Sequence, residues 1–189
     1  MSVDYAAARE IMVDSQMRTH DVTNVALLQA LGQVGRERFV PEGREYLAYA
    51  DTEIEYAPGR WMLRPRDISK LLQNLAPQHG ETALAIAAPY AAAVLEAMGL
   101  AVTRLEAADP QLPSGNFDVI VCEGAVSKTP PAWLAALNVD GRLAVVERNG
   151  PVGRAMLYLR TADQVAPRVV FDSTPPILAG FEAQAGFVF

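Results

Sequence analysis

The alternation of short apolar runs with helical segments after residue 81 constrains the fold of this chain more than any other feature of its sequence. Thr82–Ala87 is an apolar run suited to a central strand, and the pattern then predicts a helix from about Tyr90 to Met98 that ends at Gly99. Further elements are predicted as strands at Ala101–Glu106, Phe117–Cys122, Arg142–Val146, Ala155–Arg160 and Arg168–Phe171, and as a helix at Pro130–Leu137. Strands that alternate with helices at this spacing pair in parallel through right-handed crossovers, so we expect an α/β fold with a mostly parallel sheet.

Helical patterns dominate the chain before this alternation begins. Tyr5–Gln16 has apolar residues at helical spacing, Thr23 is placed to cap a second helix, and Pro65 can open a third. We therefore predict an N-terminal helical part over about residues 1–80 and a sheet-containing core over about residues 81–189. A chain of 189 residues suits one domain that contains both parts.

Composition narrows the classes of partner. The net charge is −6 and the 16 basic residues are scattered, which argues against nucleic acid as a partner. Residues 83–102 contain one charged residue, Glu96, but the stretch is rich in alanine and includes Pro89, so we expect a buried strand and helix and no membrane span. The lone Cys122 excludes an intrachain disulfide and, with no apolar leader at the N-terminus, favours a cytoplasmic location. The two histidines are isolated, which predicts that there is no metal site.

Several short motifs follow one another in a fixed order between residues 9 and 160. They are Met12–Arg18 with Asp21–Asn24, Arg36–Pro41 (RERFVP), Tyr49–Asp51, Phe117–Val121 (FDVIV), Pro130–Leu134 (PPAWL) and Gly141–Leu143. In this order they resemble segments of the protein-L-isoaspartate O-methyltransferases. The resemblance implies a Rossmann-like class I methyltransferase fold that binds S-adenosylmethionine at the carboxyl edge of its sheet. It also implies methyl transfer to the carboxylate of isoaspartyl residues in a protein or peptide substrate, which is a repair reaction.

The segment after the first sheet strand departs from the family pattern of glycine, x, glycine, x, glycine. A nucleotide-like cofactor requires glycines there, because a bare backbone can approach it closely and turn sharply. By position, the candidate cofactor-binding residues are Ala87, Ala88 and Tyr90. None of them is glycine, and the intervening Pro89 lacks a backbone donor.

A second departure lies before the third helix. The family has a serine whose hydroxyl faces the reacting carboxylate, and the corresponding position here is Leu63, which offers no hydrogen bond. The next residue, Arg64, could hold a carboxylate with two parallel donors, so anion binding could survive without chemistry.

Three acidic residues are candidates for the same edge of the sheet. Glu106 falls where the family places the acid that holds the ribose hydroxyls, with a solvated strand end as the alternative, and Asp109 could match the acid near the adenine. Residues 107–116 are shorter than the family segment, which predicts one strand fewer at that edge. Glu123 follows a strand, where a buried carboxylate would have a raised pKa and could act as a base, with a relic of the fold or a simple surface charge as the favoured alternative.

The C-terminal stretch is more apolar than a free terminus. Its large apolar residues are Ile177, Leu178, Phe181, Phe187 and Phe189. We expect this stretch to pack on the body of the protein or on a second copy, which would make a homodimer.

Three hypotheses about function follow. The first is a divergent S-adenosylmethionine-dependent methyltransferase of the isoaspartyl-repair type, which the family resemblance favours. The second is a non-catalytic member that binds a protein or peptide, which the missing glycines and Leu63 favour. The third is a different small ligand near Glu106 and Glu123.

Overall fold

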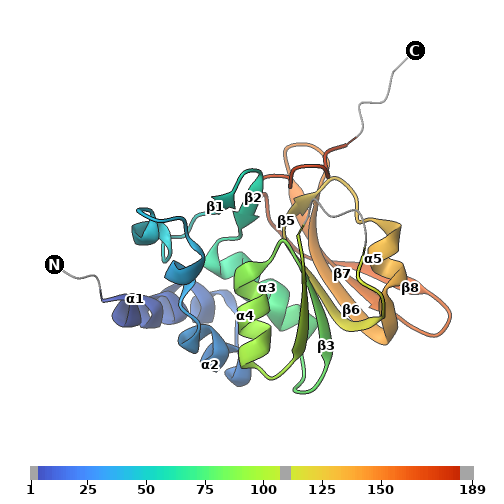
Figure 1. The fold of residues 1–189 in the computed structure, drawn as a ribbon, viewed down its shortest axis with the longest axis horizontal. Helices are drawn as coiled ribbons and strands as arrows, with labels where there is room; N and C mark the ends of the chain where they lie inside the picture. Colours follow the sequence, from blue (N-terminus) through green and yellow to red (C-terminus); the bar gives the residue numbers. More distant parts are fainter. Residues whose placement is uncertain (1–3, 107–111, 184–189) are drawn as a thin grey trace, which may run out of the picture.

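The main sheet is mixed and has six strands in the order β4-β3-β5-β6-β7-β8 (Figure 1). The computed structural model describes residues 4–106 and 112–183. The strands are β3 (Thr82–Ile86), β4 (Ala101–Leu105), β5 (Phe117–Val126), β6 (Leu137–Arg148), β7 (Gly153–Arg160) and β8 (Val165–Asp172). The four strands from β4 to β6 pair in parallel, whereas β7 and β8 pair antiparallel. The prediction of a mostly parallel α/β sheet is confirmed.

The change from parallel to antiparallel pairing follows from the connections. Helix α4 (Pro89–Ala97) joins β3 to β4, and the short α5 (Pro131–Ala135) lies between β5 and β6. Residues 149–152 alone join β6 to β7, which is too short for a crossover and forces a hairpin. Within the described residues β4 is an edge strand, in agreement with the predicted shortening of the sheet there.

Helices cover the two faces of the sheet unequally (Figure 1). Helices α1 (Tyr5–Met12), α2 (Val25–Gln33), α3 (Pro65–Leu75) and α4 contribute to one large apolar cluster with one face of the sheet. The opposite face is covered by α5 and by part of the C-terminal segment, through Trp133 and Leu178. Because side chains alternate along a strand, Ala83 and Ala85 belong to the first cluster and Leu84 and Ile86 to the second.

The N-terminal helices differ from the sequence pattern in two details. The α-helix that starts at Tyr5 ends at Met12 and continues as a π-helical turn over Val13–Met17, so the predicted helix changes its hydrogen bonding before it ends. The residue that caps α2 is Asn24, whose side chain accepts from the Leu27 amide at 3.0 Å. Thr23 was therefore the wrong cap, whereas Pro65 does open α3 as predicted.

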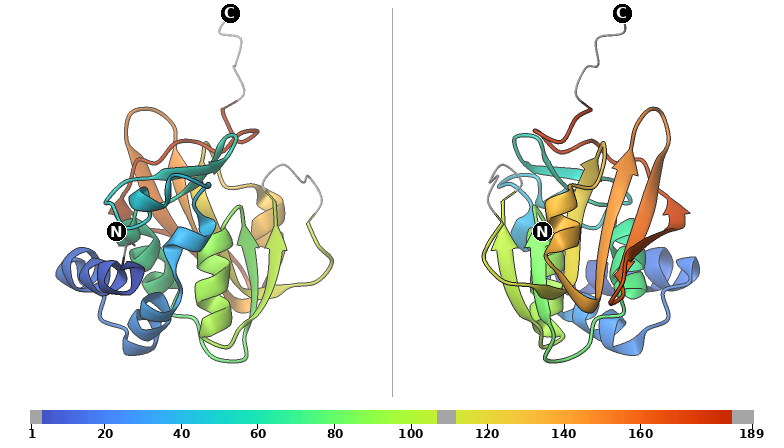
Figure 2. Two further views of the ribbon diagram at one scale, coloured as in Figure 1. Left: turned by 60° about the vertical axis from the view of Figure 1, so that its left-hand side comes forward. Right: turned by 90° about the vertical axis from the view of Figure 1, so that its right-hand side faces the viewer.

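A small hairpin and the C-terminal segment meet beside the sheet (Figures 1 and 2). The hairpin is formed by β1 (Ile54–Ala57) and β2 (Arg60–Met62). The Ala179 amide donates to the Gly59 carbonyl at the hairpin turn, with a nitrogen–oxygen distance of 3.1 Å. Among the helices of the described residues, none is long and apolar enough to span a bilayer.

Candidate functional site at the switch point of the sheet

The strand order reverses between β3 and β5, and this position defines the candidate site. After β3 the chain crosses to β4 on one side, and β5 then pairs with β3 on the other. Ligands of open α/β sheets bind outside the carboxyl ends of the strands at such a switch point. The residues that meet there are Leu63, Ala87, Ala88, Tyr90, Ala91 and Glu123, and we call them the switch-point site.

The bend after β3 is made without glycine. Ala87 has a φ of 47°, in the left-handed region that glycine adopts most easily, and its amide donates to the Leu105 carbonyl at 2.8 Å. Pro89 then takes the first helical position of α4, where its missing N–H costs least. Ala87 and Ala88 are almost fully buried. The chain therefore makes the sharp turn, but it carries methyl groups where the family has bare backbone.

Tyr90 points into the protein interior. Its side chain is fully buried, and its ring lies edge-on to Phe39 with centroids 5.9 Å apart. The guanidinium carbon of Arg36 lies 4.6 Å from the centroid of the Tyr90 ring. Within the described residues the Tyr90 hydroxyl has no hydrogen-bond partner, and burial raises its pKa. Tyr90 thus fills the interior beside the α4 N-terminus.

Glu123 is the chemically distinctive residue of the site. Strand β5 continues past it to Val126, with an irregularity in its pairing to β6 between Val121 and Ala125. The carboxylate is 0% exposed and accepts from the Leu63 amide at 3.1 Å and the Ala91 amide at 3.4 Å. Burial raises its pKa to about 7, although Arg36 and the two amides act in the opposite direction. This agrees with the expectation of a raised pKa for a buried carboxylate at this position.

Arg36 is a site residue that the sequence analysis missed. It is fully buried, its Nε donates to the Ala48 carbonyl at 2.8 Å, and its Nη2 donates to the Leu63 carbonyl at 2.8 Å. It lies in the RERFVP motif, but nothing in that motif indicates that a cation would be buried near Glu123. Its position depends on how the turn at Arg36–Phe39 packs against α4 and the segment that contains Leu63.

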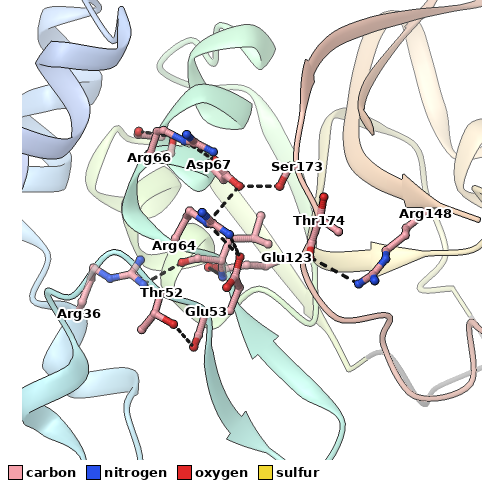
Figure 3. Close-up of polar contacts among 12 residues, drawn as sticks. Arg36, Thr52, Glu53, Arg64, Arg66, Asp67, Glu123, Arg148, Ser173 and Thr174 are labelled. Carbon is pink, nitrogen blue, oxygen red and sulfur yellow. Dashed lines mark hydrogen bonds and ion pairs between the residues drawn. The ribbon is translucent and has the colours of Figure 1, made fainter. Parts of the chain in front are cut away.

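Leu63 and Arg64 both have partners within the protein, and Figure 3 shows those of Arg64. Leu63 is 0% exposed and belongs to the main apolar cluster. Arg64 donates through Nε and Nη2 to one oxygen of Glu53, at 2.9 and 2.7 Å, and its Nε lies 3.6 Å from the Asp67 carboxylate. Asp67 in turn accepts from the Ser173 hydroxyl at 2.5 Å. Two of the donors that could hold a substrate carboxylate are therefore used internally.

The other acidic candidates lie farther out. The Glu106 side chain is 70% exposed, and it forms an ion pair with Arg60 of the hairpin. This pair ties the hairpin to the end of β4. Asp109 lies outside the residues that the structure describes.

The C-terminal segment packs over the end of β5. Leu178 is fully buried, its amide donates to the Ala125 carbonyl at 2.8 Å, and the Ala125 amide donates to the Pro176 carbonyl at 3.1 Å. The Phe181 ring lies 5.3 Å from the ring of Trp133 between centroids. This part of the apolar stretch packs on its own chain, as one of the two predictions has it, and Phe187 and Phe189 lie outside the described residues.

Other reactive groups do not extend the site. Cys122 is fully buried and burial raises its pKa, which makes it an inert structural thiol. Among residues 4–106 and 112–183, histidine, cysteine and acidic side chains nowhere gather in threes that could hold a metal ion.

The parallel strands and the reversal of strand order define a Rossmann-like α/β protein. The switch-point site lies at that reversal, where proteins of this class bind ligands. The protein-L-isoaspartate O-methyltransferase of Methylorubrum populi is 31% identical over 181 residues, which cover 81% of this chain and 85% of that protein. Enzyme 1 of the same name from Rhodopseudomonas palustris is 32% identical over 198 residues, covering 89% of this chain and 76% of that protein. The chain therefore belongs to the protein-L-isoaspartate O-methyltransferase family, although no family model matches it.

A solved structure supports the fold independently. A Plasmodium falciparum crystal structure described as a protein-L-isoaspartate O-methyltransferase in complex with S-adenosyl-L-homocysteine superimposes with a TM-score of 0.73. The match covers 94% of this chain and 99% of that chain at 13% identity, so it establishes the fold.

Proposed function

We propose that this chain is a non-catalytic member of its family that binds a protein or peptide without transferring a methyl group. The observation that carries the proposal is the buried carboxylate of Glu123. It accepts hydrogen bonds from the amides of Leu63 and Ala91, so a side chain of the protein occupies donors at the edge of the sheet where a cofactor would be held.

The residues at the bend are a poor fit for S-adenosylmethionine bound in the family manner. Ala87 and Ala88 carry β-carbons where close approach requires bare backbone, and Pro89 has no N–H to donate. Glu106, the acid expected to hold ribose hydroxyls, already pairs with Arg60. The Ala91 amide in the first turn of α4 already donates to Glu123.

The substrate side of the site lacks a group for chemistry. Leu63 has no hydroxyl, and its side chain belongs to the core. Arg64 is held by Glu53 and Asp67, so it orders the start of α3. These contacts favour a structural role over methyl transfer.

A surface hollow beside the hairpin is the place we propose for a peptide. A shallow open hollow of about 390 Å³ lies beside the hairpin and is lined by Pro41, Glu55, Tyr56, Ala57 and Pro58. The relatives carry names that specify isoaspartyl residues of proteins. A peptide that contains aspartyl or isoaspartyl residues is therefore the probe we choose.

Calorimetry with S-adenosylmethionine and S-adenosylhomocysteine tests the catalytic half of the proposal. We expect neither to bind at millimolar concentration, which corresponds to about −4 kcal/mol. We also expect no methylation of an isoaspartyl peptide. Micromolar binding of either compound together with methyl transfer would establish the alternative, a working methyltransferase, and would overturn the proposal.

Fluorescence anisotropy with labelled isoaspartyl and aspartyl peptides tests the binding half. We expect binding that Tyr56→Ala weakens at least tenfold, because Tyr56 lines the hollow. The matched control is Gln29→Ala, in a separate hollow of about 370 Å³ near His79, and it should leave binding unchanged. Equal weakening by both variants, or no binding of either peptide, would contradict the assignment.

A further inference from the structure

Glu123 connects parts of the chain that are distant in sequence. It lies on β5, accepts from the amide of Leu63 just after the hairpin, and accepts from the amide of Ala91 in the first turn of α4. The first-turn amides of a helix have no acceptor within the helix. The carboxylate therefore joins the segment after the hairpin and the start of α4 to the sheet at the switch-point site.

The groups that face Glu123 leave its charge incompletely balanced. Arg36 from the turn before the hairpin is the cation that favours the ionised form, but its Nε and Nη2 donate to carbonyls instead. Tyr56 from β1, Tyr90 from α4 and the neighbouring Cys122 also interact with it. Burial raises the pKa of all three, so they are neutral around pH 7 and add no charge beside Glu123.

We propose that Glu123 is a proton-controlled latch that holds the Leu63 segment and α4 against β5 when its carboxyl is neutral, and that releases this contact to water when it ionises. The physical reason is the loss of hydration. A buried carboxylate regains its hydration when the contact opens. In the closed contact, two amide hydrogen bonds and the nearby charge of Arg36 replace that hydration only in part. Access to the switch-point site then depends on pH around neutrality, whether or not the site binds a methyl donor.

The size of the effect follows from proton linkage. The pKa of Glu123 rises from 4.5 to about 7 in the closed contact. If opening restores the ordinary value, the ratio of open to closed molecules increases roughly 300-fold as the pH rises from below 4.5 to above 7. Most of that change falls between these two values.

Amide hydrogen exchange followed by NMR between pH 5 and pH 8 tests the latch. After correction for the intrinsic exchange rate, the protection of the Leu63 and Ala91 amides should fall by roughly two orders of magnitude over this range. Their protection should stay below that of the Val121 amide in the centre of β5. Such a difference would show that the contact opens without global unfolding. Protection equal to that of Val121 at pH 8 would overturn the proposal.

Two variants isolate the carboxyl group. Glu123→Gln cannot ionise, so the pH dependence at Leu63 and Ala91 should disappear. Glu147→Gln is the matched control: it removes a half-buried glutamate on β6 whose pKa is lowered, and the pH dependence should remain. Persistence of the trend in Glu123→Gln would contradict the latch.

A measurement on the unmodified protein covers the case in which Glu123→Gln does not fold. The carbon-13 chemical shift of the Glu123 carboxyl reports its titration directly. A midpoint near 7, together with the fall in protection at Leu63 and Ala91, supports the latch. A midpoint near 4.5 refutes it.

Discussion

Replacement of Leu63 by serine restores the hydroxyl at the family's reactive position and also tests whether that position is a site or a core. The Leu63 side chain is fully buried in the main apolar cluster. Removing a buried leucine costs about 2 to 5 kcal/mol through lost transfer energy and the remaining cavity. A hydroxyl left there without a partner adds about 1 kcal/mol or more. We expect Leu63→Ser to lower the free energy of unfolding by about 3 to 6 kcal/mol, a large fraction of a typical total.

Urea denaturation followed by far-UV circular dichroism at pH 7 measures this loss. The matched control is Leu63→Met, which keeps the volume and should cost less than about 1.5 kcal/mol. We also expect Leu63→Ser to remain unable to methylate an isoaspartyl peptide. A loss below about 1 kcal/mol would refute the reasoning, because it would mean that the position faces an open site and not the core.

Three further predictions concern Glu123 and the backbone. Because the folded pKa of Glu123 is raised from 4.5 to about 7, the folded state holds more protons between these values, and its stability falls as pH rises through them. The free energy of unfolding should therefore fall by about 3 kcal/mol more in the parent protein than in Glu123→Gln between pH 4 and pH 8, and parallel urea-derived curves would exclude this. Gly124→Ala should lower the free energy of unfolding by about 2 kcal/mol or more, because Gly124 has a φ of 130° and a β-carbon there would lie 2.6 Å from Leu178. The control is Gly150→Ala, which should cost clearly less because Gly150 has a φ of 118° but open space around it. Ala76→Gly should raise the urea midpoint by an amount worth about 0.5 to 1 kcal/mol, because exposed Ala76 ends α3 at a φ of 45°, and a lower midpoint would contradict that assignment of strain.

The elements of the sheet could be read from the sequence because their signals are local. Thr82–Ala87 is an apolar run of strand length, and Pro65 opens α3 as predicted, whereas α4 begins at Pro89, one residue before the predicted start. The ends of the helices and strands were harder to predict from the sequence. Strand β5 continues from Cys122 to Val126, and no periodicity marks that extension because Gly124 interrupts it. The edge position of β4 followed from a missing segment, which is also a property of the chain alone.

The candidate site could be predicted only as a set of positions. The sequence placed Glu123 at the carboxyl edge but favoured a surface charge over a buried base, and only the packed structure shows that its side chain is buried. Nothing in the sequence indicated Arg36 near Glu123, or Glu53 as the partner of Arg64. The sequence does not show which charged residues will pair with one another, so these assignments had to come from the packed structure.

The amino-acid order alone determined the family, the alternation of strands and helices, and the presence of Ala87 and Leu63 at the positions where the resemblance implies a glycine and a serine. These properties depend on which side chains are present and on spacing over a few residues. The tertiary structure decided that the Glu123 carboxylate meets the amide of Leu63, which is 60 positions away, and that both lie out of contact with water. Desolvation and hydrogen bonding between distant segments arise only when those segments pack together, and they are what set the charge state and the accessibility of this site.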